Sequence, residues 1–114
     1  GDIHHLFPKN YLTKNDLPKG QYNQVANYVY LQQEINIKIS DAAPREYMAT
    51  VIEQCKTGKP IYGGITDLDK LKENLQQNCI PEGFEFMDIN NYTEFLAKRR
   101  ELMAEKIREY YEAL

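Results

Sequence analysis

The sequence has no tryptophan, only two cysteines and no long apolar run. The cysteines, Cys55 and Cys79, are far apart and form no CxxC pair, which argues against a disulfide framework and against a cysteine zinc site. A transmembrane helix needs about 20 consecutive apolar residues, and none is present. The N-terminal segment also lacks the basic start and the apolar stretch of a signal peptide. We therefore expect a protein of a reducing, cytoplasmic compartment with no membrane partner.

Basic residues are not in excess either. The 114 residues include 14 Lys and Arg against 17 Asp and Glu, a net charge of -3, which excludes a strongly basic coat for non-specific nucleic-acid binding but leaves room for a local basic site. The chain does have 42% hydrophobic residues, with 9 tyrosines and 4 phenylalanines, enough for the core of one compact domain. Because the first chemically informative residues come within five positions of the start, we interpret the chain as the C-terminal fragment of a longer protein.

Two strands are predicted in the N-terminal third of the chain. Residues 2–7 predict a short strand that ends at Pro8, because proline lacks a backbone donor and keeps the preceding residue extended. The polar residues 9–24 predict a long loop. The β-branched and aromatic residues 25–31 predict the second strand. The apolar spacing then changes, and residues 33–40 predict a short helix.

The rest of the chain predicts three helices. They cover residues 44–56, a segment from an N-cap at Thr66 to about residue 78, and a last helix from about residue 91 to the C terminus. Charges of alternating sign on the last helix, Arg99 among them, indicate a solvated, salt-bridged face. Apolar residues recur on the same helix at steps of three and four: Phe95, Leu96, Leu102, Met103, Ile107, Tyr110 and Leu114. We expect Leu102, Met103 and Ile107 to be buried against the helix that holds Tyr47 and Val51 or against the Leu68–Leu75 helix, and Tyr110 and Tyr111 to lie in the core or at a domain interface.

The two histidines, His4 and His5, are adjacent and stand on the first predicted strand. Imidazole nitrogens and the amide oxygens of residues such as Asn27 and Asn36 can coordinate a divalent cation. A histidine that titrates near neutral pH can also take a proton from water for attack on phosphorus. Taken alone, two histidines near an N terminus are more often a tag remnant or part of a solvated strand than a catalytic site, and an asparagine is usually a turn or cap residue. The order and spacing of the whole set favour a site.

That order resembles a known nuclease motif. The run His4-His5-Leu-Phe-Pro8, followed by Asn27, eight residues and Asn36, resembles the HNH, or ββα-metal, motif, and residues 23–40 are similar to its second half. More narrowly, the chain resembles the C-terminal nuclease domain of GmrSD-type modification-dependent restriction endonucleases and their bacterial relatives. In that family a ParB-like N-terminal domain precedes the HNH-like part. Two later segments, Pro44–Tyr47 and Tyr92–Arg99, also resemble the family.

The resemblance implies a role for each matching residue. It implies that His5 is the general base, that His4 and Asn36 are the metal ligands, and that Asn27 braces the loop and orients the catalytic histidine. Colicin-type nucleases carry a further ligand four residues after the second one, and Ser40, a poor ligand, stands there. The resemblance therefore implies a weakly held metal, and a catalytically inactive ββα unit stays open as the alternative.

The implied fold class is α+β, with a ββα-metal unit at residues 1–42 and a mainly helical subdomain packed on it at residues 43–114. The implied function is a metal-dependent DNA endonuclease that hydrolyses phosphodiester bonds with Mg²⁺ or Mn²⁺ as part of a bacterial restriction or defence protein. Its implied partners are DNA and a ParB-like N-terminal domain of the same polypeptide. Candidate contacts to the substrate phosphate are Lys9, Lys38 and Arg45. The alternative function is an inactive interaction or structural module of a larger protein.

Overall fold

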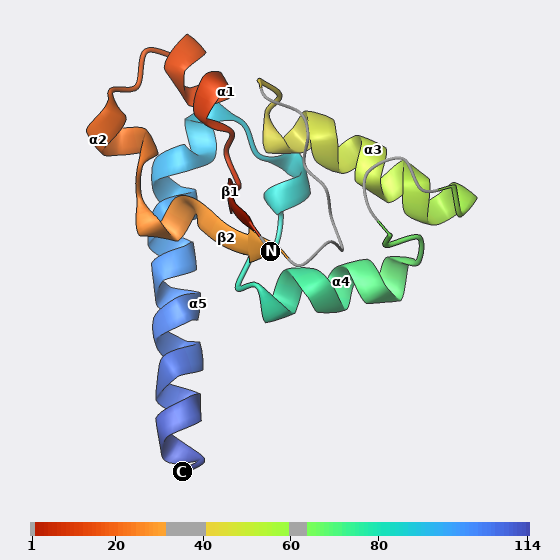
Figure 1. Cartoon of the computed structure of the whole chain (residues 1–114), viewed down its shortest axis with the longest axis vertical. Helices are drawn as coiled ribbons and strands as arrows, with labels where there is room; N and C mark the ends of the chain where they lie inside the picture. Colours follow the sequence, from red (N-terminus) through yellow and green to blue (C-terminus); the bar gives the residue numbers. More distant parts are fainter. Residues whose placement is uncertain (1, 32–40, 60–63) are drawn as a thin grey trace.

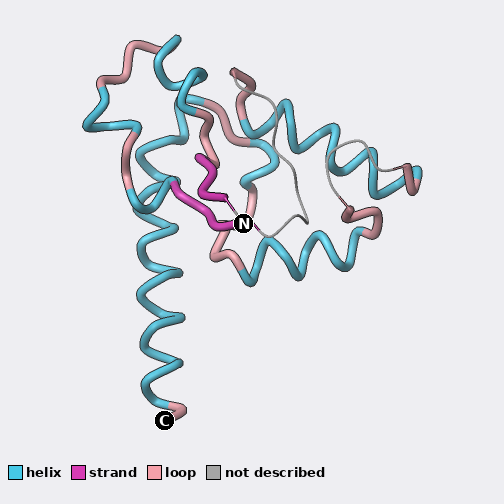
Figure 2. Tube along the Cα trace, in the orientation of Figure 1, coloured by secondary structure: helices cyan, strands magenta, loops and turns pink. Residues whose placement is uncertain are grey.

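A computed structural model of the chain describes residues 2–31, 41–59 and 64–114 (Figure 1). Two short strands, β1 (Asp2–His5) and β2 (Tyr28–Leu31), form an antiparallel sheet near the N terminus. The described residues that follow are mainly helical, and Figure 2 shows the two strands lying side by side among the helices. This arrangement confirms the expected α+β class. No helix within the described ranges is both long enough and apolar enough to cross a membrane.

The register of the sheet places His5 opposite Tyr28 and His4 opposite Val29. The first strand lies within the range expected from the sequence. The second begins three residues later than expected, because Val25–Asn27 form a short 3₁₀ turn, η1, before the extended segment starts.

The segment between the strands corrects the prediction of a long loop at residues 9–24. It contains two short helices, α1 (Lys9–Lys14) and α2 (Lys19–Tyr22). Helices of this length have little stability of their own in water and depend on tertiary packing. The packing comes from Leu12, which is fully buried, and from Tyr11, whose hydroxyl accepts a hydrogen bond from the backbone N–H of Ile89 at 2.8 Å.

Three longer helices lie close to their predicted positions. Helix α3 (Pro44–Thr57) begins with proline in its first turn and ends at Gly58, whose positive φ of 73° suits a residue without a Cβ. Helix α4 (Leu68–Gln77) begins one residue later than expected: Asp67, not Thr66, is the N-cap, and its carboxylate accepts from the N–H groups of residues 69 and 70. Helix α5 (Tyr92–Glu112) follows two 3₁₀ turns, η2 (Phe84–Phe86) and η3 (Ile89–Asn91).

One aromatic core joins the strands to the helices. The ring of Phe7, in the turn after β1, lies 4.8 Å from the ring of Phe95, 5.1 Å from that of Tyr92 and 6.1 Å from that of Phe84, measured between centroids. Tyr47 of α3 packs on Phe84 and donates a hydrogen bond from its hydroxyl to the carbonyl of Leu6. Residues 1–42 and 43–114 therefore contribute side chains to the same core.

The second half of α5 departs from the expected packing. The helix is buried on one face at Tyr92, Phe95 and Leu96, and then runs on beyond the rest of the molecule (Figure 1). The prediction that Leu102 and Ile107 are buried is wrong, because the body of the domain ends before the helix does, and Met103 is only half-buried. Tyr110 and Tyr111 do not lie in the core, and their place at a domain interface stays a prediction. The exposed residues, with their exposed fractions, are Leu102 (41%), Ile107 (57%), Tyr110 (64%), Tyr111 (68%) and Leu114 (85%).

Arg99 is a second correction, since it is buried instead of solvated. Its guanidinium donates hydrogen bonds to the backbone carbonyls of Ala26 at 2.9 Å, Asn78 at 3.1 Å, and Tyr28. Burial lowers the pKa of Arg99 from its usual value. A long planar group with several donors can satisfy carbonyls from separate segments at once. Arg99 thus fixes the start of β2 and the end of α4 to α5.

The remaining charges of α5 agree better with a salt-bridged face. Lys98 pairs with Glu94 at 2.9 Å, and Arg108 pairs with Glu105. Both pairs follow helical spacing and lie at the surface, where such pairs add little to stability.

Candidate functional site

His5 lies at the end of β1 and has a defined environment. Its ring meets the ring of Tyr28 edge-on, at 4.9 Å between centroids and an interplanar angle of 77°. Its Nε2 atom lies 3.3 Å from Oδ1 of Asn23. These two contacts limit the orientations available to the imidazole.

Asn23 is a site residue that sequence reasoning missed, because its polar neighbours indicated an ordinary loop. A signal for it does exist in the sequence. Asn23 stands just before the second strand, and antiparallel pairing brings the start of that strand to the end of the first, where His5 lies. Two strands predicted in antiparallel order would therefore have placed Asn23 near His5.

Asn27 is fully buried and fixes the turn that follows His5. Its Oδ1 accepts a hydrogen bond from the backbone N–H of Phe7 at 2.8 Å, and its Nδ2 donates to the carbonyl of the same residue at 3.0 Å. The backbone carbonyl of Asn27 also accepts from the N–H of Leu6 at 2.8 Å. The side chain thus satisfies two buried backbone groups that would otherwise lose their partners. The side chain of Asn27 therefore hydrogen-bonds to the backbone of Phe7, and the asparagine side chain that contacts the imidazole of His5 is that of Asn23.

His4 is half-buried and stands opposite Val29, which is in the core. Successive residues of a regular strand point to opposite faces of the sheet, so His4 and His5 leave β1 on different sides. Strand β1 is an edge strand of the described two-stranded sheet. A substrate that meets both imidazoles must therefore reach around this edge.

The predicted metal site is described only in part. Asn36, Ser40 and Lys38 lie outside the described residues, so the expected convergence of His4, His5 and Asn36 stays a prediction. Within the ranges that the structure describes, no three His, Cys, Asp or Glu side chains gather as a metal site. Of the two predicted ligands, the described one is His4, whose imidazole is of a type that suits Mn²⁺ and similar ions.

The two described phosphate candidates differ in their surroundings. Lys9 begins α1, and its Nζ atom lies 5.6 Å from the ring centroid of Tyr22, the residue before Asn23. Arg45, in the first turn of α3, pairs with Asp88 at 3.3 Å. A carboxylate next to Arg45 competes with a phosphate for the guanidinium. Of the two, Lys9 is therefore the better candidate for a phosphate contact.

Comparison with known proteins gives one distant relative. No protein-family model matches the chain, and no solved structure matches it. The chain is 28% identical to the uncharacterized protein MJ0686 of Methanocaldococcus jannaschii, in an alignment that is 123 positions long and covers 93% of this chain. It covers 20% of the archaeal protein, so the chain spans about a fifth of the length of that relative. The chain is thus similar, over most of its length, to part of a much longer archaeal protein whose name assigns no activity.

Proposed function

We propose that the chain is a metal-dependent DNA endonuclease module that hydrolyses phosphodiester bonds, with His5 as the general base. One observation carries the proposal: the imidazole of His5 is positioned by Asn23 and Tyr28 at the end of a strand whose following turn is fixed by Asn27. A general base has to be held in one orientation within reach of the proton that it removes. Asn23 and Tyr28 contact the imidazole of His5, and the buried side chain of Asn27 holds the turn that follows it. These contacts support His5 in the role of general base.

The chemistry follows from the contact at Nε2. In the tautomer whose Nε2–H donates to Oδ1 of Asn23, the lone pair of His5 is on Nδ1. Nδ1 can take a proton from a water molecule while the oxygen of that water attacks phosphorus. Lys9 can bind a phosphate oxygen. In the proposal, His4 and Asn36 hold a Mg²⁺ or Mn²⁺ ion, whose chemistry is to neutralise charge that develops on the phosphate.

The wider assignment is part of the same proposal. A place in a bacterial restriction or defence protein, DNA as substrate, a ParB-like domain in the same polypeptide and a cytoplasmic location all rest on the resemblance of His4–Pro8, Asn27 and Asn36 to the HNH motif. The second candidate function is a catalytically inactive interaction module. The exposed apolar residues of α5 favour that candidate, since patches of this kind are typical of surfaces that bind partners.

Plasmid nicking by the full-length protein, across a titration of Mg²⁺ and Mn²⁺, tests the proposal. His5→Ala should lower the cleavage rate by about 10²–10⁴-fold, with the melting temperature and the affinity for DNA close to those of the wild type. Higher Mn²⁺ should partly restore Asn36→Ala, because that variant loses a ligand, and should not restore His5→Ala. Lys19→Ala, a change at an exposed residue of α2, is the control.

Wild-type cleavage by His5→Ala would contradict the general-base role. Absence of both Mn²⁺ binding and cleavage in the wild-type protein would instead support the inactive module.

A further inference from the structure

The exposed end of α5 carries an ordered apolar surface. Ile107, Tyr110 and Tyr111 stand at positions i, i+3 and i+4 of α5, which places them on one face of the helix, and Leu114 follows just after the helix ends. More than half of each residue is exposed. We call these four residues the tip stripe. Their spacing is the one by which amphipathic helices enter apolar grooves.

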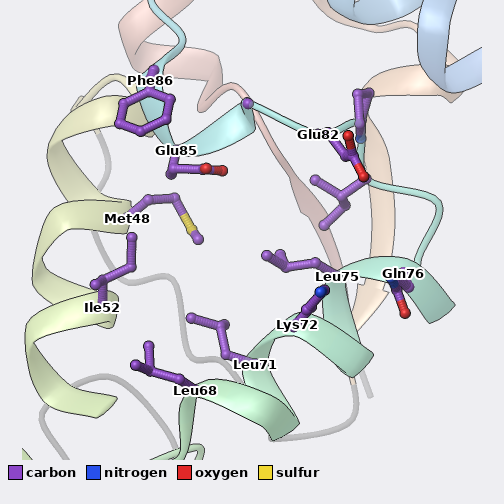
Figure 3. A pocket seen from close by; sticks show the side chains of 13 residues that line it. Met48, Ile52, Leu68, Leu71, Lys72, Leu75, Gln76, Glu82, Glu85 and Phe86 are labelled. Carbon is purple, nitrogen blue, oxygen red and sulfur yellow. The ribbon is translucent and has the colours of Figure 1, made fainter. Parts of the chain in front are cut away.

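The same molecule has an apolar groove of matching kind. A cavity of about 510 Å³ lies between α3, α4 and the turn that includes η2 (Figure 3). Phe86 at its edge is 76% exposed and Leu68 is 47% exposed. We call this cavity the α3–α4 groove. Its apolar lining comes from Met48, Ile52, Leu68, Leu71, Leu75, Ile80 and Phe86.

The groove and the stripe agree in length. The lining along α4 extends from Leu68 to Gln76, and at a rise of 1.5 Å per residue this span is about 12 Å. By the same rise, the helical part of the tip stripe, from Ile107 to the end of α5 at Glu112, is about 8 Å long. The end of α5 can therefore lie within the groove.

Charges at the margins are complementary as well. The groove is bordered by Lys72 on α4 and by Glu82 and Glu85 on the opposite side. The tip stripe is flanked by Arg108 and Glu112. A helix in the groove can bring Arg108, which pairs with Glu105 of its own helix, near the glutamates as well, and can bring Glu112 to Lys72. Such pairs set the direction in which the helix binds more than they raise its affinity.

We propose that the α3–α4 groove binds the tip stripe of a second copy of this chain. In a single copy, α5 passes the C-terminal end of α4, and its last turns extend beyond the rest of the molecule, so the tip stripe does not lie in the groove of its own chain (Figure 1). When each copy gives its tip stripe to the groove of the other, a two-fold dimer closes and both apolar surfaces are covered. This proposal is independent of the nuclease chemistry.

Analytical ultracentrifugation of the 114-residue chain tests the dimer. The mass should rise from 13.4 kDa toward twice that value as concentration increases. The helix variant Ile107→Ser/Tyr111→Ser should remain monomeric, and so should the groove variant Leu68→Ser/Phe86→Ser. The matched control Glu94→Ser/Glu101→Ser, at exposed positions of the same helix, should dimerise like the wild type. Melting curves test whether each variant folds. If the double groove variant does not fold, the single variant Phe86→Ser replaces it as the groove variant.

Mixing the two monomeric variants tests the groove directly. The helix variant keeps its groove and the groove variant keeps its helix, so the mixture should form a heterodimer with one intact contact and a weaker affinity than the wild type. A wild-type chain that stays monomeric at every soluble concentration would overturn the proposal. A groove variant that dimerises like the wild type would also overturn it and would indicate pairing between two α5 helices. A mixture of the two variants that remains monomeric would overturn it as well.

Discussion

Replacing Asn27 by alanine would remove the hydrogen bonds that hold the turn after His5. The side chain is fully buried, and it satisfies both the N–H and the carbonyl of Phe7, which is itself 0% exposed. Each buried backbone group left without a partner costs about 1–3 kcal/mol. We therefore expect the free energy of unfolding to fall by about 2–6 kcal/mol, a large part of the ~5–15 kcal/mol that is typical of a domain.

Urea unfolding followed by circular dichroism measures this change, and thermal melting gives a second reading. At about 4 °C per kcal/mol for a domain of this size, the melting temperature should fall by roughly 10 °C or more. Asn23→Ala is the matched control, because it removes the other asparagine near His5 from an exposed position. It should change stability by no more than about 0.5 kcal/mol. If Asn27→Ala were as stable as this control, the argument from buried backbone groups would be refuted.

Two further predictions concern packing and pH. Phe95→Ala should lower the free energy of unfolding by about 3–5 kcal/mol, and Leu102→Ala by less than about 1 kcal/mol, because Phe95 is 0% exposed and Leu102 is 41% exposed. Urea unfolding measures both, and equal losses would contradict the exposed position of Leu102. Burial raises the pKa of Tyr92 to about 12 and that of Tyr47 well above its usual value. Above about pH 10 the unfolded chain gives up these protons while the folded chain keeps them, so stability should be full below that pH and fall between about pH 10 and 12. Ultraviolet titration of tyrosinate in the folded protein checks this, and ionisation of all 9 tyrosines near pH 10 would oppose it.

The elements that could be predicted from the sequence have strong local signals. Pro44 begins α3, and the apolar periodicity after residue 91 indicates α5. These signals act within a few residues of the chain and need no knowledge of tertiary contacts. Helices α1 and α2 lacked such signals, because what stabilises them is the burial of Leu12 and the contact of Tyr11 with a residue 78 positions away.

The parts that could not be predicted depend on where distant segments meet. Periodicity shows which residues of α5 share a face, but not how far the body extends along the helix, so the exposure of Ile107 was missed. A charged side chain is expected at the surface. Arg99 is buried instead, because three backbone carbonyls from distant segments accept hydrogen bonds from its guanidinium. In the candidate site, the sequence order indicated His5 and Asn27, whereas the contact of Asn23 follows only from the register of the strands.

The carbonyl contacts of Arg99 set the order in which the domain can be completed during synthesis. The hydrogen bond from Arg99 to Tyr28 spans 71 residues, and Ala26 is bound by the same guanidinium. At about 5–20 residues per second, the ribosome adds those 71 residues in about 4–14 s. A two-stranded hairpin alone is marginal in water. The strand that carries His5 is therefore made well before Arg99, the residue that secures its partner strand, and a chain interrupted before residue 99 would leave the nascent hairpin without its anchor.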